Sequence, residues 1–181
     1  MIGADFDKTL TNYDTFIPFL CYYSTQSILK RLGLILVIVM AVALKMRLVS
    51  NDVYKSFAVK VMFRGDHYVY FNKRAREYSS RIELNGLGQQ MARRDKLIIL
   101  TASFKEYIEP LFPNAVIYGT ELDIDDKGYI KGLITNLYGY NKLFKYRENH
   151  NEKMTIFYSD SPSDLCLKDV SIEFKLVEVK R

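Results

Sequence analysis

Four short apolar segments, each followed directly by polar residues, most constrain the fold of this 181-residue chain. The clearest is Leu97–Leu100 in "DKLIILTAS", an unbroken apolar run of the kind that is buried on both faces of a parallel sheet. The other segments are "MIGADF", "AVIYGTEL" and "MTIFYSDS", and "SIEFKLVEV" is a candidate for a last strand. Helical patterns at 84–94 and 104–111 flank the second segment. Strands that alternate with helices predict an α/β fold with a parallel sheet.

About eighty residues separate the first two apolar segments, which is too many for a single crossover helix. We therefore expect an inserted unit at 13–85, with residues 1–12 and 86–181 forming the α/β core. Apolar side chains make up 49% of the chain, enough for a buried core. Within the core, "DIDDKGYIKGLIT" carries an Asp-Lys-Gly turn, which predicts a β-hairpin.

The inserted unit contains "LGLILVIVMAVAL", residues 32–44, which has no charged residue and is bracketed by Lys30, Arg31, Lys45 and Arg47. As a helix this run covers roughly 20 Å, against roughly 30 Å of bilayer hydrocarbon. It is too short to span a membrane unaided. Two interpretations stay open: a buried helix of the inserted unit, or a helix that lies on a membrane surface with its basic flanks on anionic headgroups.

The net charge of +5 is concentrated in the inserted unit. Residues 24–76 hold ten basic and two acidic residues, a balance of +8, whereas the remainder holds sixteen basic and nineteen acidic residues, a balance of −3. This segment is either a solvated basic face or a surface for an anionic partner or membrane. No recognised nucleic-acid-binding module accompanies the basic residues, so nucleic acid is not an expected partner.

The cysteines and histidines exclude several classes of site. Cys21 and Cys166 lie far apart, and His67 and His150 lack partners at metal or triad spacing, so neither a disulfide framework nor a zinc site is indicated. The chain opens on charged residues rather than on a basic and then apolar leader, so we expect a cytoplasmic protein.

Polar side chains follow three of the predicted strands at the point where each strand ends. In parallel sheets, ligands bind outside the carboxyl ends of the strands. If these strands are neighbours, three separate parts of the chain converge on one crevice. The polar residues concerned are Asp5, Asp7, Thr101, Ser103, Asp160, Ser161 and Asp164.

Such a crevice favours phosphoryl chemistry. Clustered carboxylates repel one another unless a cation compensates them, and oxygen ligands without histidine suit Mg²⁺. Because alternate residues of an extended segment point the same way, Asp5 and Asp7 can face one substrate. One of them can attack phosphorus while the other transfers protons.

The sequence resembles the haloacid dehalogenase (HAD) superfamily of phosphatases. The four motifs of this superfamily occur here in order as "DFDKTLT", "LIILTAS", "GYNK" and "YSDSPSD". The resemblance implies a Rossmann-like core, Mg²⁺ as cofactor, Asp5 as the nucleophile and Asp7 as the general acid and then base. It implies phosphate binding by Thr101, Ser103 and Lys142, with Lys145 as a substitute for Lys142. The implied metal ligands are Asp5, Asp7 through its backbone carbonyl, and Asp160, with Asp164 in support.

An insertion between the first two motifs resembles the helical C1 cap of the phosphoserine phosphatase-like members. The aromatic-rich stretch that leads into the apolar run most resembles bacterial phosphatidylglycerophosphatases of the C type. This resemblance implies a Mg²⁺-dependent phosphomonoester hydrolase that acts through an aspartyl-phosphate on a membrane lipid phosphate, at the inner face of the membrane. The alternatives are a phosphatase of a small soluble phosphomonoester such as phosphoserine, and a HAD-fold binding module without turnover. A phosphotransferase would use the same residues as a hydrolase, so the sequence does not separate these two activities.

The sequence departs from the family pattern in two places. Ser159 stands where most members have glycine, and only four residues precede Asp5, so we expect a first strand shorter than is usual for the centre of a parallel sheet.

Overall fold

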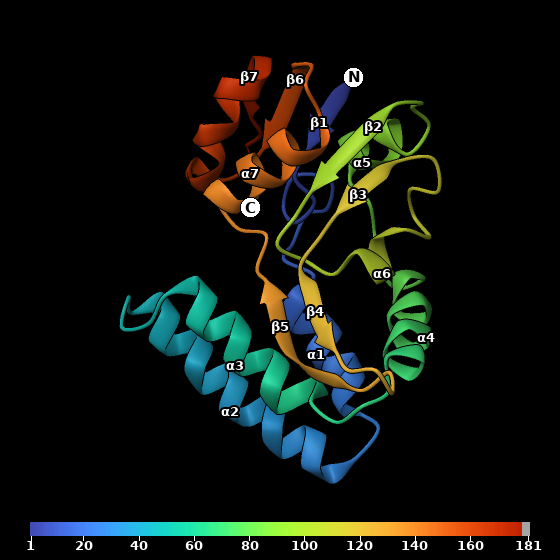
Figure 1. Ribbon diagram of the computed structural model, residues 1–181, viewed down its shortest axis with the longest axis vertical. Helices are drawn as coiled ribbons and strands as arrows, with labels where there is room; N and C mark the ends of the chain where they lie inside the picture. Colours follow the sequence, from blue (N-terminus) through green and yellow to red (C-terminus); the bar gives the residue numbers. More distant parts are fainter. Residues whose placement is uncertain (179–181) are drawn as a thin grey trace.

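The computed structural model describes residues 1–178, and a five-stranded sheet forms its centre (Figure 1). The strands are β1 (Ile2–Ala4), β2 (Leu97–Leu100), β3 (Val116–Tyr118), β6 (Met154–Ser159) and β7 (Ser171–Leu176). Their order is β3-β2-β1-β6-β7, and every neighbouring pair is parallel. The predicted α/β fold with a parallel sheet is confirmed. The last residue of the predicted final strand, Val179, lies outside the described residues.

Strand β2 is buried on both faces, as its unbroken apolar run predicted. Leu97 and Ile99 belong to one hydrophobic cluster, whereas Ile98 and Leu100 belong to another. The first cluster also takes in side chains of α5 (Gly86–Met91) and α6 (Lys105–Ile108), which are shorter than the predicted helices at 84–94 and 104–111. The second takes in α7 (Tyr140–Asn149) and the 3₁₀ helix η1 (Pro162–Val170).

Strand β1 is short, and the close approach of β6 explains how it still lies at the centre of the sheet. Gly3 pairs with Ile98 on one side and Phe157 on the other. A Cβ at Gly3 would overlap Met154 Sδ and the Phe157 ring, so any larger residue would displace these two side chains. Beyond the strand, the Asp5 N–H donates to Tyr158 O at 2.8 Å, which continues the pairing into the loop.

The first four of the five helices between β1 and β2 form a helical region, as expected for an insertion, and lie below the sheet in Figure 1. Aromatic side chains pack this helical region against the core. The ring of the fully buried Phe19 lies 5.9 Å from those of Phe63 and Phe71 and 6.0 Å from that of Phe104, which follows β2. The helices are α1 (Phe16–Ser24), α2 (Ile28–Lys45), α3 (Asn51–Phe63) and α4 (Tyr68–Ser79).

The predicted hairpin is present as β4 (Glu121–Ile124) and β5 (Ile130–Thr135), in a sheet of its own. The run 115–122 was expected to form one strand, but it is divided between β3 and β4. The division falls at Gly119, where a Cβ would lie only 2.7 Å from Ser103 O, and the Thr120 N–H donates to that same carbonyl. The hairpin packs on the helical region, where the Gly65 N–H donates to Ile130 O at 2.9 Å.

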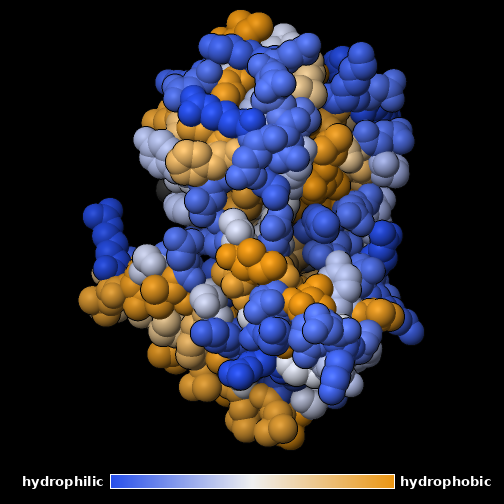
Figure 2. Space-filling view, viewed as in Figure 1, coloured by the Kyte–Doolittle hydropathy of each residue, from blue (hydrophilic) through white to orange (hydrophobic). Residues whose placement is uncertain are grey.

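Helix α2 carries the apolar run 32–44, and most of its large side chains are exposed. Within the helix only Gly33 and Val37 are buried. The interpretation of this run as a buried helix therefore fails for its outer face, which forms the hydrophobic margin at the lower left of Figure 2. No helix within residues 1–178 has the length and apolar character needed to cross a membrane. The exposed apolar residues on and next to α2 include Ile28, Leu29, Leu32, Ile35, Leu36, Val39, Val42 and Met46.

Candidate active site

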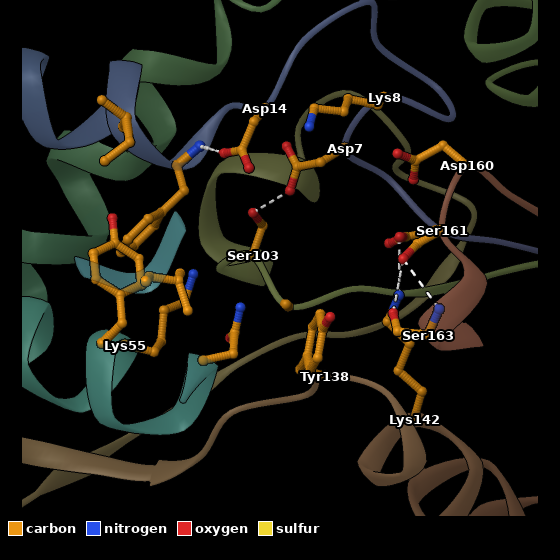
Figure 3. A pocket seen from close by; sticks show the side chains of 17 residues that line it. Asp7, Lys8, Asp14, Lys55, Ser103, Tyr138, Lys142, Asp160, Ser161 and Ser163 are labelled. Carbon is orange, nitrogen blue, oxygen red and sulfur yellow. Dashed lines mark hydrogen bonds and ion pairs between the residues drawn. The ribbon is translucent and has the colours of Figure 1, made fainter. Parts of the chain in front are cut away.

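The loop that follows β1 places two acids on the same side of the chain. The intervening Phe6 is fully buried in the core, with its ring edge-on to Phe112 at 6.2 Å. Asp5 and Asp7 accordingly both line one cavity of about 230 Å³ (Figure 3). Lys8, next in the chain, has a φ of 57°, a left-handed conformation that turns the loop back.

Asp5 is held by two contacts at the edge of this cavity. Its Oδ1 accepts a hydrogen bond of 2.7 Å from the Phe6 N–H, and its Oδ2 lies 2.9 Å from Lys142 Nζ. The residue is only 8% exposed. Burial raises the pKa of Asp5 to about 8, even though Lys142 beside it acts in the opposite direction.

Lys142 reaches Asp5 because of the way α7 begins. Gly139 caps the helix with a φ of 55°, a conformation that favours glycine, and Lys142 then lies in the first turn. Its Nζ also pairs with Asp164 Oδ2 at 2.7 Å. Although burial disfavours its charge, the ion pairs with Asp5 and Asp164 raise the pKa of Lys142. The alternative lysine, Lys145, instead pairs with Glu121 at 2.7 Å and lies outside the cavity lining.

Asp7 is tied to the helical region and to the loop after β2. Its Oδ1 accepts from the Thr15 N–H at 2.7 Å and from the Thr15 hydroxyl at 2.6 Å. Its Oδ2 accepts from the Ser103 hydroxyl at 2.5 Å, the contact drawn between these residues in Figure 3. Burial, with Asp14 nearby, raises the pKa of Asp7. A carboxyl in this environment favours the protonated form, which is what a general acid requires.

Thr101 and Ser103 follow β2 at different depths. Thr101 is fully buried, and its Oγ1 accepts a hydrogen bond of 3.0 Å from the Ser103 N–H. Ser103 lines the cavity, whereas Thr101 lies behind it. The structure thus brings Ser103 to the predicted crevice and makes Thr101 a support for it.

The end of β6 contributes Asp160, which lines the cavity. Thr9, whose role the sequence analysis missed, joins it to the β1 loop: Thr9 Oγ1 accepts from the Asp160 N–H at 2.9 Å and donates to Asp160 Oδ1 at 3.4 Å. Thr9 is the first threonine of "DFDKTLT", so the motif itself contained the signal. Burial raises the pKa of Asp160.

Asp164 is fully buried and supports Lys142 from behind the cavity. The Ser159 hydroxyl donates to its Oδ2 at 2.7 Å. Ser159 is not among the residues with positive φ, so serine takes the place of the family's usual glycine without backbone strain. The sequence analysis missed this function of the hydroxyl.

The helical region supplies the opposite wall of the cavity. These residues carry no motif, and only the tertiary fold brings them to the acids, which is why the sequence analysis missed them. They are Phe16 and Ile17 of α1, Leu44 of α2, and Asn51, Tyr54 and Lys55 of α3.

In a comparison with models of protein families, the model of haloacid dehalogenase-like hydrolases matches residues 2–168 of this chain. The chain belongs to the haloacid dehalogenase-like hydrolase family. The parallel sheet with a helical region between β1 and β2 is the HAD core with a C1 cap, as the resemblance implied. No curated protein matches the sequence.

Solved structures agree with this HAD-like fold at low identity. A HAD family hydrolase from Salmonella enterica subsp. enterica serovar Typhi aligns with TM-score 0.62 and 13% identity, over 94% of this chain but only 59% of its own. A phosphoserine phosphohydrolase-like protein from Francisella tularensis subsp. tularensis aligns with TM-score 0.62 and 16% identity, over 96% and 84%. A phospho-aspartyl intermediate analogue of phosphoserine phosphatase aligns with TM-score 0.56 and 15% identity, over 99% and 93%.

The predicted magnesium site of this HAD-like hydrolase differs from expectation. Within residues 1–178, no three acids, histidines or cysteines group closely enough to hold a metal ion. The carboxylate of Asp7 is engaged by Thr15 and Ser103, and that of Asp164 by Ser159 and Lys142. Four acids therefore do not form one preformed cluster.

Asp5 and Asp160 still fit a magnesium ion. Both line the cavity, and both offer oxygen donors. Mg²⁺ keeps several waters and uses one or two carboxylates together with substrate phosphate, so it needs no larger cage. Burial raises the pKa of Asp5 and that of Asp160, and a bound cation would act in the opposite direction on both.

Proposed function

We propose that this chain is a Mg²⁺-dependent phosphomonoester hydrolase that works through an aspartyl-phosphate on Asp5. The observation that carries the proposal is the arrangement of Asp5, with Lys142 Nζ at 2.9 Å, beside Asp7 in one cavity. A nucleophilic carboxylate, a cation and a second carboxyl of raised pKa are the groups that two-step phosphoryl transfer requires.

In the proposed first step, Asp5 Oδ attacks phosphorus, and the bond from phosphorus to the ester oxygen breaks. Asp7 gives its proton to the departing alkoxide. In the second step, Asp7 takes a proton from water, whose oxygen attacks the aspartyl-phosphate and releases inorganic phosphate. The two steps restore Asp5 as a carboxylate and Asp7 as an acid, so the net reaction is hydrolysis of the ester.

Phosphate oxygens would be bound by Lys142 and Ser103, which line the cavity, with Thr101 holding Ser103 in place. Positioned donors of this kind stabilise the charge on the transferring group. Mg²⁺ would be held by the carboxylates of Asp5 and Asp160 and by the backbone carbonyl of Asp7, with Asp164 in support through Lys142. The metal would neutralise phosphate charge.

The proposal includes a division of the chain into a core, residues 1–12 and 86–181, and a cap, residues 13–85. The cap supplies the cavity wall that faces the acids, including Tyr54 and Lys55. Because the reactive groups come from the core, substrate choice would rest mainly with the cap.

A small soluble phosphomonoester is the better supported substrate. Two of the structural relatives are described as phosphoserine phosphatase or a protein like it, and the small volume of the cavity agrees with a small ligand. A binding module without turnover is less favoured, because Asp5, Asp7 and Lys142 are all in place around the cavity.

A lipid phosphate at the cytoplasmic face of a membrane, such as phosphatidylglycerophosphate, is the second candidate. The observation that favours it is the exposed apolar face of α2, which is flanked by Lys30, Arg31 and Lys45 and whose Leu44 reaches the cavity. Flotation with anionic vesicles at low salt tests this contact. Binding that Leu36→Asp abolishes would support it, and no binding of the wild type would exclude it.

Hydrolysis of p-nitrophenyl phosphate tests the proposed activity, with and without Mg²⁺ and with Asp5→Asn as the control. We expect magnesium-dependent release that the control loses. Release by the control at more than about a tenth of the wild-type rate would exclude Asp5 as the nucleophile.

A further inference from the structure

The cavity holds a second lysine, which phosphoryl transfer does not use. Lys55 of α3 lines the cavity and is only 5% exposed. In Figure 3 it lies on the opposite side of the cavity from Lys142. Lys142 is tied to Asp5 and Asp164, whereas Lys55 has no hydrogen bond or ion pair with any residue of the part of the chain that the structure describes.

The ammonium group of Lys55 contacts aromatic rings and forms no ion pair with an acid among the described residues. Lys55 Nζ lies 3.3 Å from the centre of the Phe16 ring and 5.6 Å from that of Phe104. Burial lowers the pKa of Lys55 to about 8, although Asp14 and Asp7 act in the opposite direction. A buried cation without a hydrogen-bond acceptor is costly, and a ligand that brings an acceptor removes that cost.

We propose that Lys55 binds a second anionic group of the substrate, so that the enzyme acts on phosphomonoesters that also carry a carboxylate or a phosphodiester. This inference rests on the proposed hydrolase function, since it assumes that the phosphomonoester lies at Asp5. Each of the two lysines then binds a different group of the substrate. Lys142 binds the group that is transferred, and Lys55 binds the group that stays.

The chemistry at Lys55 is common to two kinds of substrate. A carboxylate would come from a small acid such as phosphoserine, and a phosphodiester from a phosphorylated glycerolipid headgroup. Both place oxygen acceptors at Nζ, and a charge-assisted hydrogen bond in a buried site is of the strong kind. A substrate without a second anionic group leaves Lys55 unpaired.

The test compares pairs of substrates with and without this group, and the effect of the substitution on each pair separates the anion from the other differences between the two substrates, such as the acyl chains. Phosphoserine is compared with phosphoethanolamine, which lacks the carboxylate, and short-chain phosphatidylglycerophosphate with glycerol phosphate, which lacks the phosphodiester. The measured quantity in each pair is kcat/KM for the substrate that carries the second anionic group, divided by kcat/KM for the substrate that lacks it. We expect Lys55→Met to lower at least one ratio by about 10- to 100-fold, and the pair that responds identifies the anion.

Lys60→Met is the matched control, because Lys60 lies one turn and a half further along α3 and is exposed. This variant should leave both ratios within about twofold. Ratios that Lys55→Met leaves unchanged in both pairs would overturn the inference.

A second readout does not need turnover. In Asp5→Asn protein, the rate at which an amine-acylating reagent modifies Lys55 is followed by mass spectrometry, with and without each ligand. The inference is supported if phosphoserine or phosphatidylglycerophosphate slows the modification of Lys55 and the matching compound without the second anion, phosphoethanolamine or glycerol phosphate, does not. This result supports the inference even if the wild type hydrolyses nothing. Equal labelling with every ligand contradicts it, whatever the outcome for hydrolysis.

Discussion

Thr9 Oγ1 accepts a hydrogen bond of 2.9 Å from the Asp160 N–H, which joins the loop after β1 to the end of β6. The two residues are neighbours only because β1 and β6 are adjacent and parallel in the sheet. We expect Thr9→Val to destabilise the protein by about 1 to 3 kcal/mol, because a partly buried N–H loses its partner. Urea unfolding measures the change. Thr155→Val is the control, because Thr155 is exposed. An equal loss of stability in both variants would contradict this role of Thr9.

Lys142 pairs with the fully buried Asp164 as well as with Asp5, so its removal should affect stability as well as activity. Lys142→Met leaves Asp164 without its cation, and we expect a loss of about 3 to 5 kcal/mol near neutral pH. The more exposed pair of Lys145 and Glu121 contributes at most about 1 kcal/mol, so Lys145→Met is the matched control. If the two variants unfold at the same urea concentration, the assignment of Lys142 as the supporting cation is wrong.

Gly139 sets the start of α7, and its φ of 55° is strained for any other residue. Gly139→Ala should therefore cost about 1 to 2 kcal/mol and lower activity, because Lys142 is placed by this turn. Gly86→Ala is the control: a Cβ there meets no atom within 4 Å and its φ is not positive. We expect that change to be neutral or slightly stabilising. The melting temperatures of both variants are measured by circular dichroism, and equal values would contradict the prediction.

Burial of Asp5 should make metal-free protein less stable as the pH rises. Its pKa is about 8 in the folded protein and 3.8 ordinarily, so between these values the folded state holds a proton that the unfolded chain has lost. The stability that this proton linkage provides is present below pH 3.8 and is lost as the pH rises through 8. Asp7 and Asp160 act in the same direction.

Asp5→Asn removes this titration, so the variant should gain stability relative to the wild type between pH 5 and pH 8. Urea unfolding at both pH values in the presence of a chelator measures the difference. A stability difference between variant and wild type that is the same at pH 5 and pH 8 would show that Asp5 does not titrate in this range.

Magnesium should stabilise the protein through Asp5 and Asp160. We expect an increase in Tm when millimolar Mg²⁺ is added near pH 7, and we expect Asp160→Asn to remove most of that increase. Asp126→Asn is the control, because Asp126 is exposed in the hairpin turn. An Asp160 variant that keeps the full shift would exclude this residue as a ligand.

The sequence predicted the parallel sheet, and the structure brings most of the predicted polar residues to one cavity, for a physical reason. The apolar run of β2 has to be buried on both faces, and the acids and hydroxyls at strand ends have to meet where parallel strands end. The motif lysine was less certain, since Lys142 and Lys145 both fit the pattern. Gly139 decides between them, because its backbone conformation starts α7 at the point that directs Lys142 to Asp5.

The sequence did not predict the far wall of the cavity, and it left open whether α2 is buried or exposed. Lys55 has no motif around it, and its position follows from the packing of α3 against Phe16 and Phe104. The run 32–44 is apolar on every side, so its pattern does not tell which face is buried. Only the position of α3 shows that Gly33 and Val37 face the protein.

The central claim is that Asp5 is the residue that carries the phosphoryl group. The most direct measurement is mass spectrometry of acid-quenched protein during turnover of p-nitrophenyl phosphate with Mg²⁺. The account predicts one added phosphoryl group on the peptide that contains Asp5, and none on the same peptide of Asp5→Asn. Turnover with the phosphoryl group on another residue, or with unmodified Asp5 when the intermediate is trapped under saturating substrate, would contradict it.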